Sequence, residues 1–299
     1  MTDSDTNSIR RWATVVESPR RVGDRWTLHV TLDQPWTDES VGGRFFMTRC
    51  GIEDDTTDSH AWNYYAGCPV YAITLQPAAH NDQPSQESTD SARPCARWHW
   101  LLPAPTDPSL PWLLARRPGD RILVYGPYGN PFSVPAPATR RNLVVIADSA
   151  RLLALLSPIH EFLDHGGRVS VLVLPGLDGV NHTAALVHAL AIQVELQFLE
   201  AGSNDPAFID GVRWADTALF AVDAAQLYQM AYKMRNARFQ TSIAGSSNVQ
   251  DEFAYALVEA DLLCGYGACL ACSVPTAGGG VTRACIHGPI FPLSRLVGP

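Results

Sequence analysis

Four cysteines crowd into one short stretch of the sequence, and their spacing constrains the chain more than any other feature. Cys264, Cys269, Cys272 and Cys285 follow the pattern C-x4-C-x2-C-x12-C and make up four of the seven cysteines in 299 residues. A C-x4-C-x2-C run followed by a more distant cysteine is the plant-type spacing of [2Fe-2S] ligands. We therefore predict that these four thiolates hold a [2Fe-2S] cluster.

The residues between the cysteines suit a tightly curled loop. Gly265 and Gly267 can take positive φ, and the small alanines beside them leave room for backbone N–H groups near the sulfurs. The glycines at 278–280 predict a hairpin that brings Cys285 back to the loop. A structural zinc site also uses four cysteines, usually as two C-x2-C pairs, and this stretch contains one such pair. Zinc and disulfides stay open as alternatives at this point.

Composition narrows the class of protein. A hydrophobic fraction of 46% and a charged fraction of 17% are typical of a globular chain, and the length allows two domains with a small appendage. The net charge of -8 argues against a nucleic-acid partner. We read no membrane span and no secretion signal, so we expect a cytoplasmic protein whose thiols stay reduced. Cys50, Cys68 and Cys95 stand apart from the loop, and we expect them to be small buried side chains.

Two stretches near the carboxyl terminus resemble one known family. LVEADLLCGYGACLACSV and the later TRACIHGPIF are similar to the electron-transfer subunit of B-type dihydroorotate dehydrogenase, and gamma subunits of some hydrogenases share the pattern. The resemblance implies a β barrel plus α/β fold of the ferredoxin-reductase type with a C-terminal [2Fe-2S] module. We accordingly expect a flavin-type antiparallel barrel at 9–138, a degenerate NAD-type α/β domain at 139–250 and the cluster module at 251–299.

The amino-terminal half predicts the barrel independently of the resemblance. Short alternating or apolar segments follow one another with no helical pattern between them, which favours an antiparallel barrel. These segments are 11–18, 25–32, 42–50, 68–75, 98–105 and 121–132. GDRILVYGPYGNPF resembles the family segment that closes the flavin barrel. By the resemblance, the candidate FAD contacts are Tyr71, Thr106, Gly126 and Gly129.

From residue 142 the pattern changes to alternating strands and helices, which predicts a doubly wound parallel sheet. We expect strands at 142–150, 168–176, 194–200, 217–224 and 238–246. We expect helices at 151–167, 181–191 and 225–236.

The chain departs from its relatives where a nicotinamide nucleotide would bind. Relatives have a glycine-rich turn after the first strand of this domain, whereas residues 147–155 read ADSARLLAL and contain no glycine. Asp148 adds negative charge there, which disfavours phosphate, and Arg151 partly offsets it. Residues 221–227 also lack the cysteine, glycine and proline of the family motif near the nicotinamide. The sequence therefore argues against NAD(P)H binding.

The flavin motif is altered as well. In the R-x-[YF]-[ST] signature, Pro69 stands in place of the arginine and Ala72 in place of the hydroxyl residue, while Tyr71 keeps the aromatic ring. Losing the arginine removes a charge-assisted contact to the pyrophosphate. Other arginines can supply this charge, and Arg49, Arg97 and Arg141 are the candidates. The sequence thus leaves FAD binding open.

The resulting expectation is an electron-transfer subunit in a hetero-oligomer. Its partner would be a redox protein, namely a flavoprotein dehydrogenase, as the resemblance implies, or a hydrogenase-type subunit. Two further hypotheses stay in view, a self-sufficient FAD/[2Fe-2S] NAD(P)H reductase and a non-catalytic scaffold subunit. No residue pattern supports hydrolysis or phosphoryl transfer, so we expect no catalytic residues and little NAD(P)H activity in the chain itself.

Overall fold

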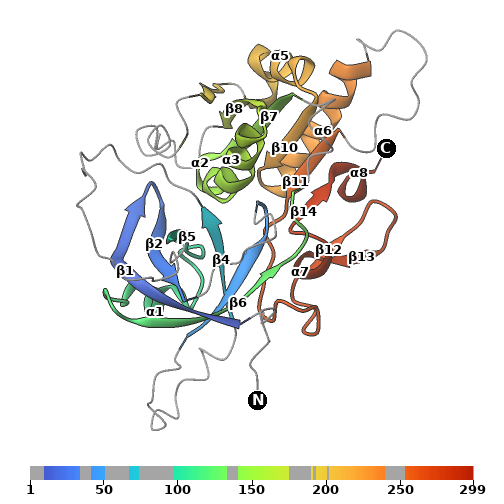
Figure 1. The fold of residues 1–299 in the computed structure, drawn as a ribbon. Coiled ribbons are helices and arrows are strands. Elements are labelled where there is room, and N and C mark those ends of the chain that lie inside the picture. The colour runs from blue at the N-terminus through green and yellow to red at the C-terminus, as the bar shows by residue number, and fades with distance from the viewer. Residues whose placement is uncertain are drawn as a thin grey trace.

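The structure is a computed structural model that describes residues 10–33, 42–50, 67–73, 97–132, 141–174, 190, 193–200, 202–239 and 253–298. Figure 1 shows three parts in contact: a barrel in blue and teal, an α/β layer in green to orange, and a red C-terminal part beside both. We call this last part, residues 259–298, the cluster module.

The barrel is closed and antiparallel, with strand order β1-β2-β5-β4-β3-β6. Its strands are β1 (Arg10–Val22), β2 (Arg25–Leu32), β3 (Phe45–Arg49), β4 (Cys68–Ile73), β5 (Arg97–Leu101) and β6 (Arg121–Tyr128). Burial alternates along β1 and β2, as expected when one face of each strand points into the barrel. The interior includes Leu28, Phe46 and Trp100, all fully buried. The predicted barrel is confirmed.

The second sheet has the order β14-β11-β10-β7-β8-β9, and every pair except β11 with β14 is parallel. Its strands are β7 (Asn142–Asp148), β8 (Arg168–Leu174), β9 (Glu195–Phe198), β10 (Thr217–Ala221), β11 (Ala254–Leu257) and β14 (Ile290–Pro292). β7 and β8 are buried along nearly their whole length, as is usual when helices cover both faces of a parallel sheet.

Short helices connect these strands. They are α1 (Leu110–Leu114) in the barrel and α2 (Ser149–Leu152), η2 (Leu153–Leu155), α3 (Leu156–Asp164), η3 (Gly202–Asn204), α5 (Pro206–Trp214) and α6 (Ala224–Phe239) around the sheet. The cluster module contributes β12 (Ser273–Pro275), β13 (Val281–Arg283), α7 (Ala284–His287) and α8 (Leu293–Leu296). β12 and β13 pair as an antiparallel hairpin around the glycines, as predicted.

One strand prediction is wrong at its start. The chain is still helical at Arg238 and Phe239, where we expected a strand over 238–246, and the rest of that range lies outside the described residues. The helix continues because apolar residues recur at helical spacing up to Ala237, with no proline or glycine to end it. The sheet takes β11 from residues 254–257 instead. The helix expected at 181–191 lies outside the described residues apart from Leu190.

The cluster module contacts both other parts. Through β14 it forms the edge of the parallel sheet, beside β11. It also bonds to the barrel, where the Gly67 N–H donates to the Leu263 carbonyl (3.1 Å) and the Asn130 N–H donates to the Gly288 carbonyl (2.7 Å). A single apolar cluster contains Phe45 of the barrel, Phe220 of the sheet and Phe291 of the module. The cysteine loop therefore stands on a rigid base.

Candidate iron–sulfur site

The cysteine loop leaves the sheet after β11 and turns back on itself through left-handed residues. Gly265 and Gly267 have φ of 79° and 80°, as their positions in the motif suggested. A Cβ on Gly265 would lie 2.9 Å from Met47 Cγ, and one on Gly267 would lie 2.8 Å from Ile286 Cγ1. The loop thus needs glycine at both positions for two reasons, the backbone conformation and the close packing.

The hairpin brings two of the cysteines together. Cys272 precedes β12 and Cys285 follows β13, and the Ala284 N–H donates to the Cys272 carbonyl (2.9 Å). Their Sγ atoms lie 3.2 Å apart and both residues are buried. This separation exceeds the roughly 2.05 Å of a disulfide, and the cysteines in the described part of the chain are free.

The other two cysteines lie at the outer side of the loop. The Cys264 thiol is hydrogen-bonded to Cys269 and interacts electrostatically with Cys285, so all four sulfurs converge on one region. Cys264 is half-buried and Cys269 is exposed. The cysteines therefore form an inner pair, Cys272 with Cys285, and an outer pair, Cys264 with Cys269. Two irons bridged by two sulfides need two thiolates each, and this grouping suits them.

The two pairs have different electrostatic surroundings. Burial alone would raise the pKa of the Cys264 thiol, but hydrogen bonds from the backbone at Cys269, Tyr266 and Ala268 outweigh it and lower that pKa from 9.0 to about 6. Burial, followed by the neighbouring Cys272, raises the pKa of Cys285 to about 12. Backbone N–H groups aimed at sulfur are the donors that stabilise a thiolate ligand. The backbone on the outer side of the loop therefore stabilises the negative charge of the Cys264 thiolate.

In the part of the chain that the structure describes, no group of three or more His, Cys, Asp or Glu side chains is arranged to hold a single metal ion. The thiols are grouped two and two. The donor set, with four sulfurs, small neighbours and backbone N–H groups turned toward Cys264, fits an iron–sulfur cluster.

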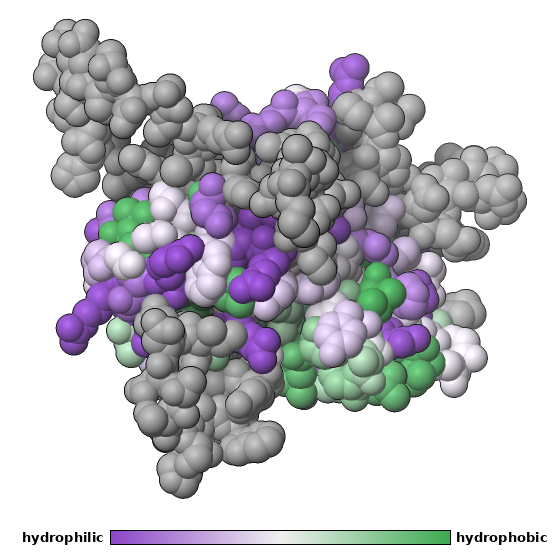
Figure 2. All heavy atoms as spheres, turned by 60° about the horizontal axis from the view of Figure 1, so that its bottom comes forward, coloured by the Kyte–Doolittle hydropathy of each residue, from purple (hydrophilic) through white to green (hydrophobic). Residues whose placement is uncertain are grey.

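Apolar side chains surround the outer pair. Leu263, Tyr266, Leu270 and Ile286 are exposed, with Tyr266 at 66% and Leu270 at 59%. We call these four residues the rim patch. Figure 2 shows apolar residues gathered on the side of the molecule that the cluster module forms. Leu270 also has a φ of 60°, the only non-glycine positive value among the described residues.

The candidate flavin residues lie on the barrel strands β4 and β6 and in the turns that follow β5 and β6. Tyr71 lies on β4 with its ring 6.4 Å from that of Phe45, and burial, followed by the nearby Glu259, raises the pKa of its hydroxyl. Thr106 is exposed in the turn before α1. Gly126 lies in β6 near Phe46, and Gly129 lies against Gly288 of the cluster module. Tyr71 and Gly126 both lie beside Phe45, and the role of all four residues in flavin binding stays a prediction.

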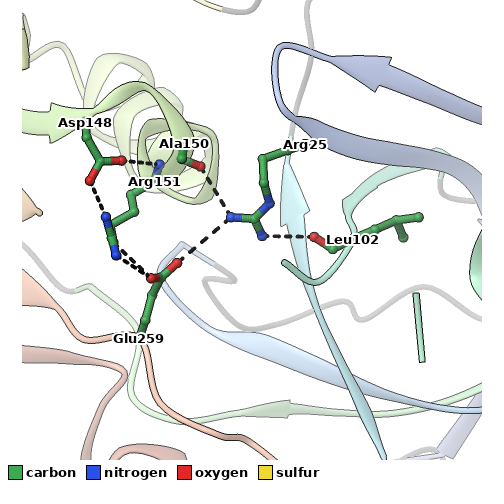
Figure 3. Close-up of polar contacts among 6 residues, drawn as sticks. All are labelled: Arg25, Leu102, Asp148, Ala150, Arg151 and Glu259. Carbon is green, nitrogen blue, oxygen red and sulfur yellow. Dashed lines mark hydrogen bonds and ion pairs between the residues drawn. The ribbon is translucent and has the colours of Figure 1, made fainter. Parts of the chain in front are cut away.

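A network of charges lies where the barrel, the sheet and the cluster module meet (Figure 3). Arg151 pairs with Asp148 and also with Glu259, to which its Nε and Nη2 lie at 2.9 and 2.8 Å. Buried Arg25 donates to the Leu102 carbonyl (2.9 Å) and the Ala150 carbonyl (3.3 Å), and its Nη1 is 3.9 Å from Glu259. We call Arg25, Asp148, Arg151 and Glu259 the junction network.

The sequence did not point to Arg25 or Glu259. Of the arginines considered for the flavin charge, Arg49 and Arg141 are exposed, and the side chain of Arg97 lies outside the description. Arg25 is the buried arginine of the junction network, but in the sequence nothing distinguishes it from other arginines at the ends of strands. Its partners are distant along the chain, so no local pattern could have identified it.

Comparisons with known proteins agree with this geometry. Residues 259–297 match the iron-sulfur cluster binding domain of dihydroorotate dehydrogenase B. A dihydroorotate dehydrogenase B (NAD(+)) electron transfer subunit of Desulforamulus reducens is 25% identical over 197 residues, covering 62% of this chain and 69% of that protein. The subunit of the same name from a Geobacillus species is 26% identical over 189 residues, covering 62% and 68%.

Solved structures support the fold alone. An NADH-dependent reduced ferredoxin-NADP oxidoreductase structure aligns with a TM-score of 0.60 at 14% identity, covering 95% of this chain and 89% of that one. The ferredoxin reductase in carbazole 1,9a-dioxygenase aligns with a TM-score of 0.51 at 14% identity, covering 76% and 63%.

The barrel and the parallel sheet together define a ferredoxin-reductase-like fold, and the thiol loop lies in a C-terminal segment that matches an iron–sulfur cluster binding domain. Within that class, the chain is most simply described by its similarities: residues 259–297 match the cluster-binding domain of dihydroorotate dehydrogenase B, and 62% of the chain aligns with its electron-transfer subunits at 25–26% identity. Among the described residues, no helix combines the length and the apolar character that crossing a membrane requires.

Proposed function

We propose that this chain is the electron-transfer subunit of a dihydroorotate dehydrogenase-like complex. In this proposal the four cysteines of the loop hold a [2Fe-2S] cluster, and the protein passes single electrons to or from a partner oxidoreductase. The observation that carries the proposal is the convergence of the four thiols as an inner and an outer pair. A cluster of this type, when bound, supplies one-electron chemistry and no bond-making step.

Each cysteine pair has a separate task in this proposal. Cys272 and Cys285 are buried, so they would hold their side of a bound cluster away from water. Cys264 and Cys269 lie at the surface, and the backbone donors around Cys264 favour its thiolate. The outer pair is therefore the side through which electrons enter or leave.

The rim patch supports docking of a partner on this side. Four exposed apolar residues surround the exposed Cys269, and apolar and aromatic side chains are typical of the centre of a protein interface. We propose that the partner is a redox subunit with a matching apolar face, and that it covers the rim patch in the complex. The family name supports a dihydroorotate-oxidising flavoprotein as that subunit. The free thiols are also consistent with the cytoplasm as the proposed location.

The ligand set is tested by exchanging cysteines. Anaerobically purified protein is expected to contain about two irons and two acid-labile sulfides per chain and to give an EPR signal on reduction. Cys269→Ser should abolish or strongly shift this signal, because it removes one of the four thiolates. Cys50→Ser is the matched control, since Cys50 is a buried barrel cysteine outside the loop.

The iron content of the two variants decides whether the loop holds the cluster. If Cys50→Ser keeps its iron and Cys269→Ser does not, the loop is the site. A protein that contains zinc and no labile sulfide contradicts the proposed function, and so does a Cys269→Ser variant with an unchanged spectrum.

A further inference from the structure

We infer that the junction between barrel and sheet is closed to FAD and to nicotinamide dinucleotides in this chain, and that the junction network links there the parts that a bound cofactor would otherwise bridge. The inference rests on the proposed function and deepens it, because it leaves the cluster as the one redox centre of the subunit. In doubly wound sheets, dinucleotides bind at the carboxyl ends of the strands, with the pyrophosphate on free backbone N–H groups at a helix start.

Carboxylates already occupy two such helix starts. Asp148 ends β7, and its Oδ1 accepts the Arg151 N–H at 2.9 Å. Asp223 follows the neighbouring strand β10, and its Oδ1 accepts the Gln226 N–H at 2.9 Å. β7 and β10 are parallel and in register, so both carboxylates lie at the same edge of the sheet. A pyrophosphate at this edge would compete with fixed negative charges for the same donors.

The facing turn of the barrel is also poor in donors. Between β5 and α1, the chain reads PAPTDPS over 103–109, and its three prolines have no N–H. Asp107 accepts the Ser109 N–H at 2.8 Å and is also bonded to the Ser109 hydroxyl. This turn therefore offers an anion a carboxylate and few free N–H groups.

The two arginines at this junction already have partners within the protein. Arg151 is held by Asp148 and Glu259, and Arg25 is held by two backbone carbonyls with Glu259 nearby. Two guanidinium charges face two carboxylate charges, so the junction network sums to zero. A pyrophosphate could not gain Arg151 without displacing a carboxylate, whose charge would then lack its partner. The two Nη groups of Arg25 already donate to backbone carbonyls, and its Nε is buried, so Arg25 offers no accessible donor either.

The same network links all three parts of the molecule (Figure 3). Arg25 begins β2 of the barrel, Arg151 lies in α2 on the sheet, and Glu259 leads into the cysteine loop. Arg25 also reaches Leu102, at the start of the donor-poor turn. Side chains of the protein itself thus connect the barrel, the sheet and the cluster module, which a dinucleotide would otherwise bridge.

The cofactor arm of the test uses the cluster-loaded protein. It is incubated with excess FAD or with NADH, separated from free ligand by gel filtration and extracted with acid, and iron is measured in the same sample. We expect no flavin above the buffer control, and no change of melting temperature with either ligand. Stoichiometric flavin in the extract, or a rise in melting temperature with FAD, would overturn the inference. Either result with iron present leaves the proposed function standing, whereas absence of iron contradicts the proposed function instead.

The network arm uses Glu259→Gln, with Glu200→Gln as control because Glu200 is an exposed glutamate away from the network. Removing the Glu259 charge is expected to lower the melting temperature by about 2–4 °C, while the control stays within error of the parent. Arg151→Lys, which keeps the charge but loses the two-pronged contact, should lower it less. If Glu259→Gln melts like the control, the network does not stabilise the junction and that half of the inference fails.

Discussion

Leu270 combines two unfavourable properties beside the candidate cluster. Its φ of 60° lies in the left-handed region, and its side chain is 59% exposed. A side chain in that conformation costs about 1 kcal/mol relative to glycine, and exposure of leucine gains nothing in the isolated chain. The position lies between Cys269 and Cys272, where glycine would fit the backbone better. A leucine here makes sense if another molecule covers it.

The substitution Leu270→Gly should therefore affect the stability of the isolated chain and its association with a partner in opposite directions. We expect the free energy of unfolding to stay equal or rise by up to about 1 kcal/mol, because the left-handed strain is relieved. We expect weaker association with the proposed redox partner subunit, because the apolar contact is lost. Denaturant unfolding and a titration of the two subunits measure these quantities. Lower stability with unchanged association would contradict a docking role for Leu270.

The end of β6 joins the barrel to the cluster module through a close backbone contact. A Cβ on Gly129 would collide with the Gly288 carbonyl oxygen and would lie 2.8 Å from Pro289 Cδ. Gly119 also has positive φ, at 93°, but a Cβ there meets open space. A side chain at either glycine would therefore adopt the same unfavourable backbone conformation, but only a side chain at Gly129 would also collide with neighbouring atoms.

Alanine at these two glycines measures the strain and the packing separately. Gly119→Ala should cost about 1 kcal/mol, which is the left-handed term alone. Gly129→Ala should cost more than Gly119→Ala in urea unfolding, and it should also loosen the cluster module. Equal losses for the two variants would mean that the contact with Gly288 contributes nothing.

Strands β2 and β5 carry a stacked histidine pair on the outside of the barrel. His29 and His99 face each other in register, with ring centroids 4.4 Å apart. Burial, followed by the charge of His29, lowers the pKa of His99 from 6.5. The folded protein therefore binds fewer protons than the unfolded chain between the lowered pKa of His99 and a pH of about 6.5. Because of this difference, the free energy of unfolding decreases as the pH falls through this range.

The free energy of unfolding should fall as the pH drops from above 6.5 toward the lowered pKa of His99, since the unfolded chain gains protons first. His99→Gln should flatten this slope, and His165→Gln, at an exposed position, should not. Urea unfolding at a series of pH values from neutral to mildly acidic measures the effect. A slope that is identical in the parent and in His99→Gln would show that the stacked pair is not its source.

Local patterns explain how much of these elements could be predicted. The alternating segments gave the barrel strands, and the glycines at 278–280 gave the hairpin that brings Cys272 to Cys285. β11 was missed because Ala254–Leu257 is short and lies directly before the polar VEAD stretch. The junction network could not be predicted, because Arg25 and Glu259 meet only after the whole chain has folded.

At the scale of the whole molecule, the barrel, the sheet and the cluster module share one core. Phe45 and Met47 of the barrel pack in the same cluster as Phe220 of the sheet and Cys285 of the module. The cysteine spacing identified the module, but it could not show that the module completes the sheet through β14. That edge strand fixes the inner cysteine pair to the rest of the protein.

The exposure of Cys269 makes the chain sensitive to oxidation when no partner covers it. The same opening that admits a partner also admits dissolved oxygen and peroxide, while the inner pair stays sheltered. If the four cysteines hold the proposed cluster, damage would begin on the side of Cys264 and Cys269. Under the proposed function, a cell that makes this chain in excess over its partner would accumulate iron-poor copies, because only the assembled complex would cover the exposed cysteine.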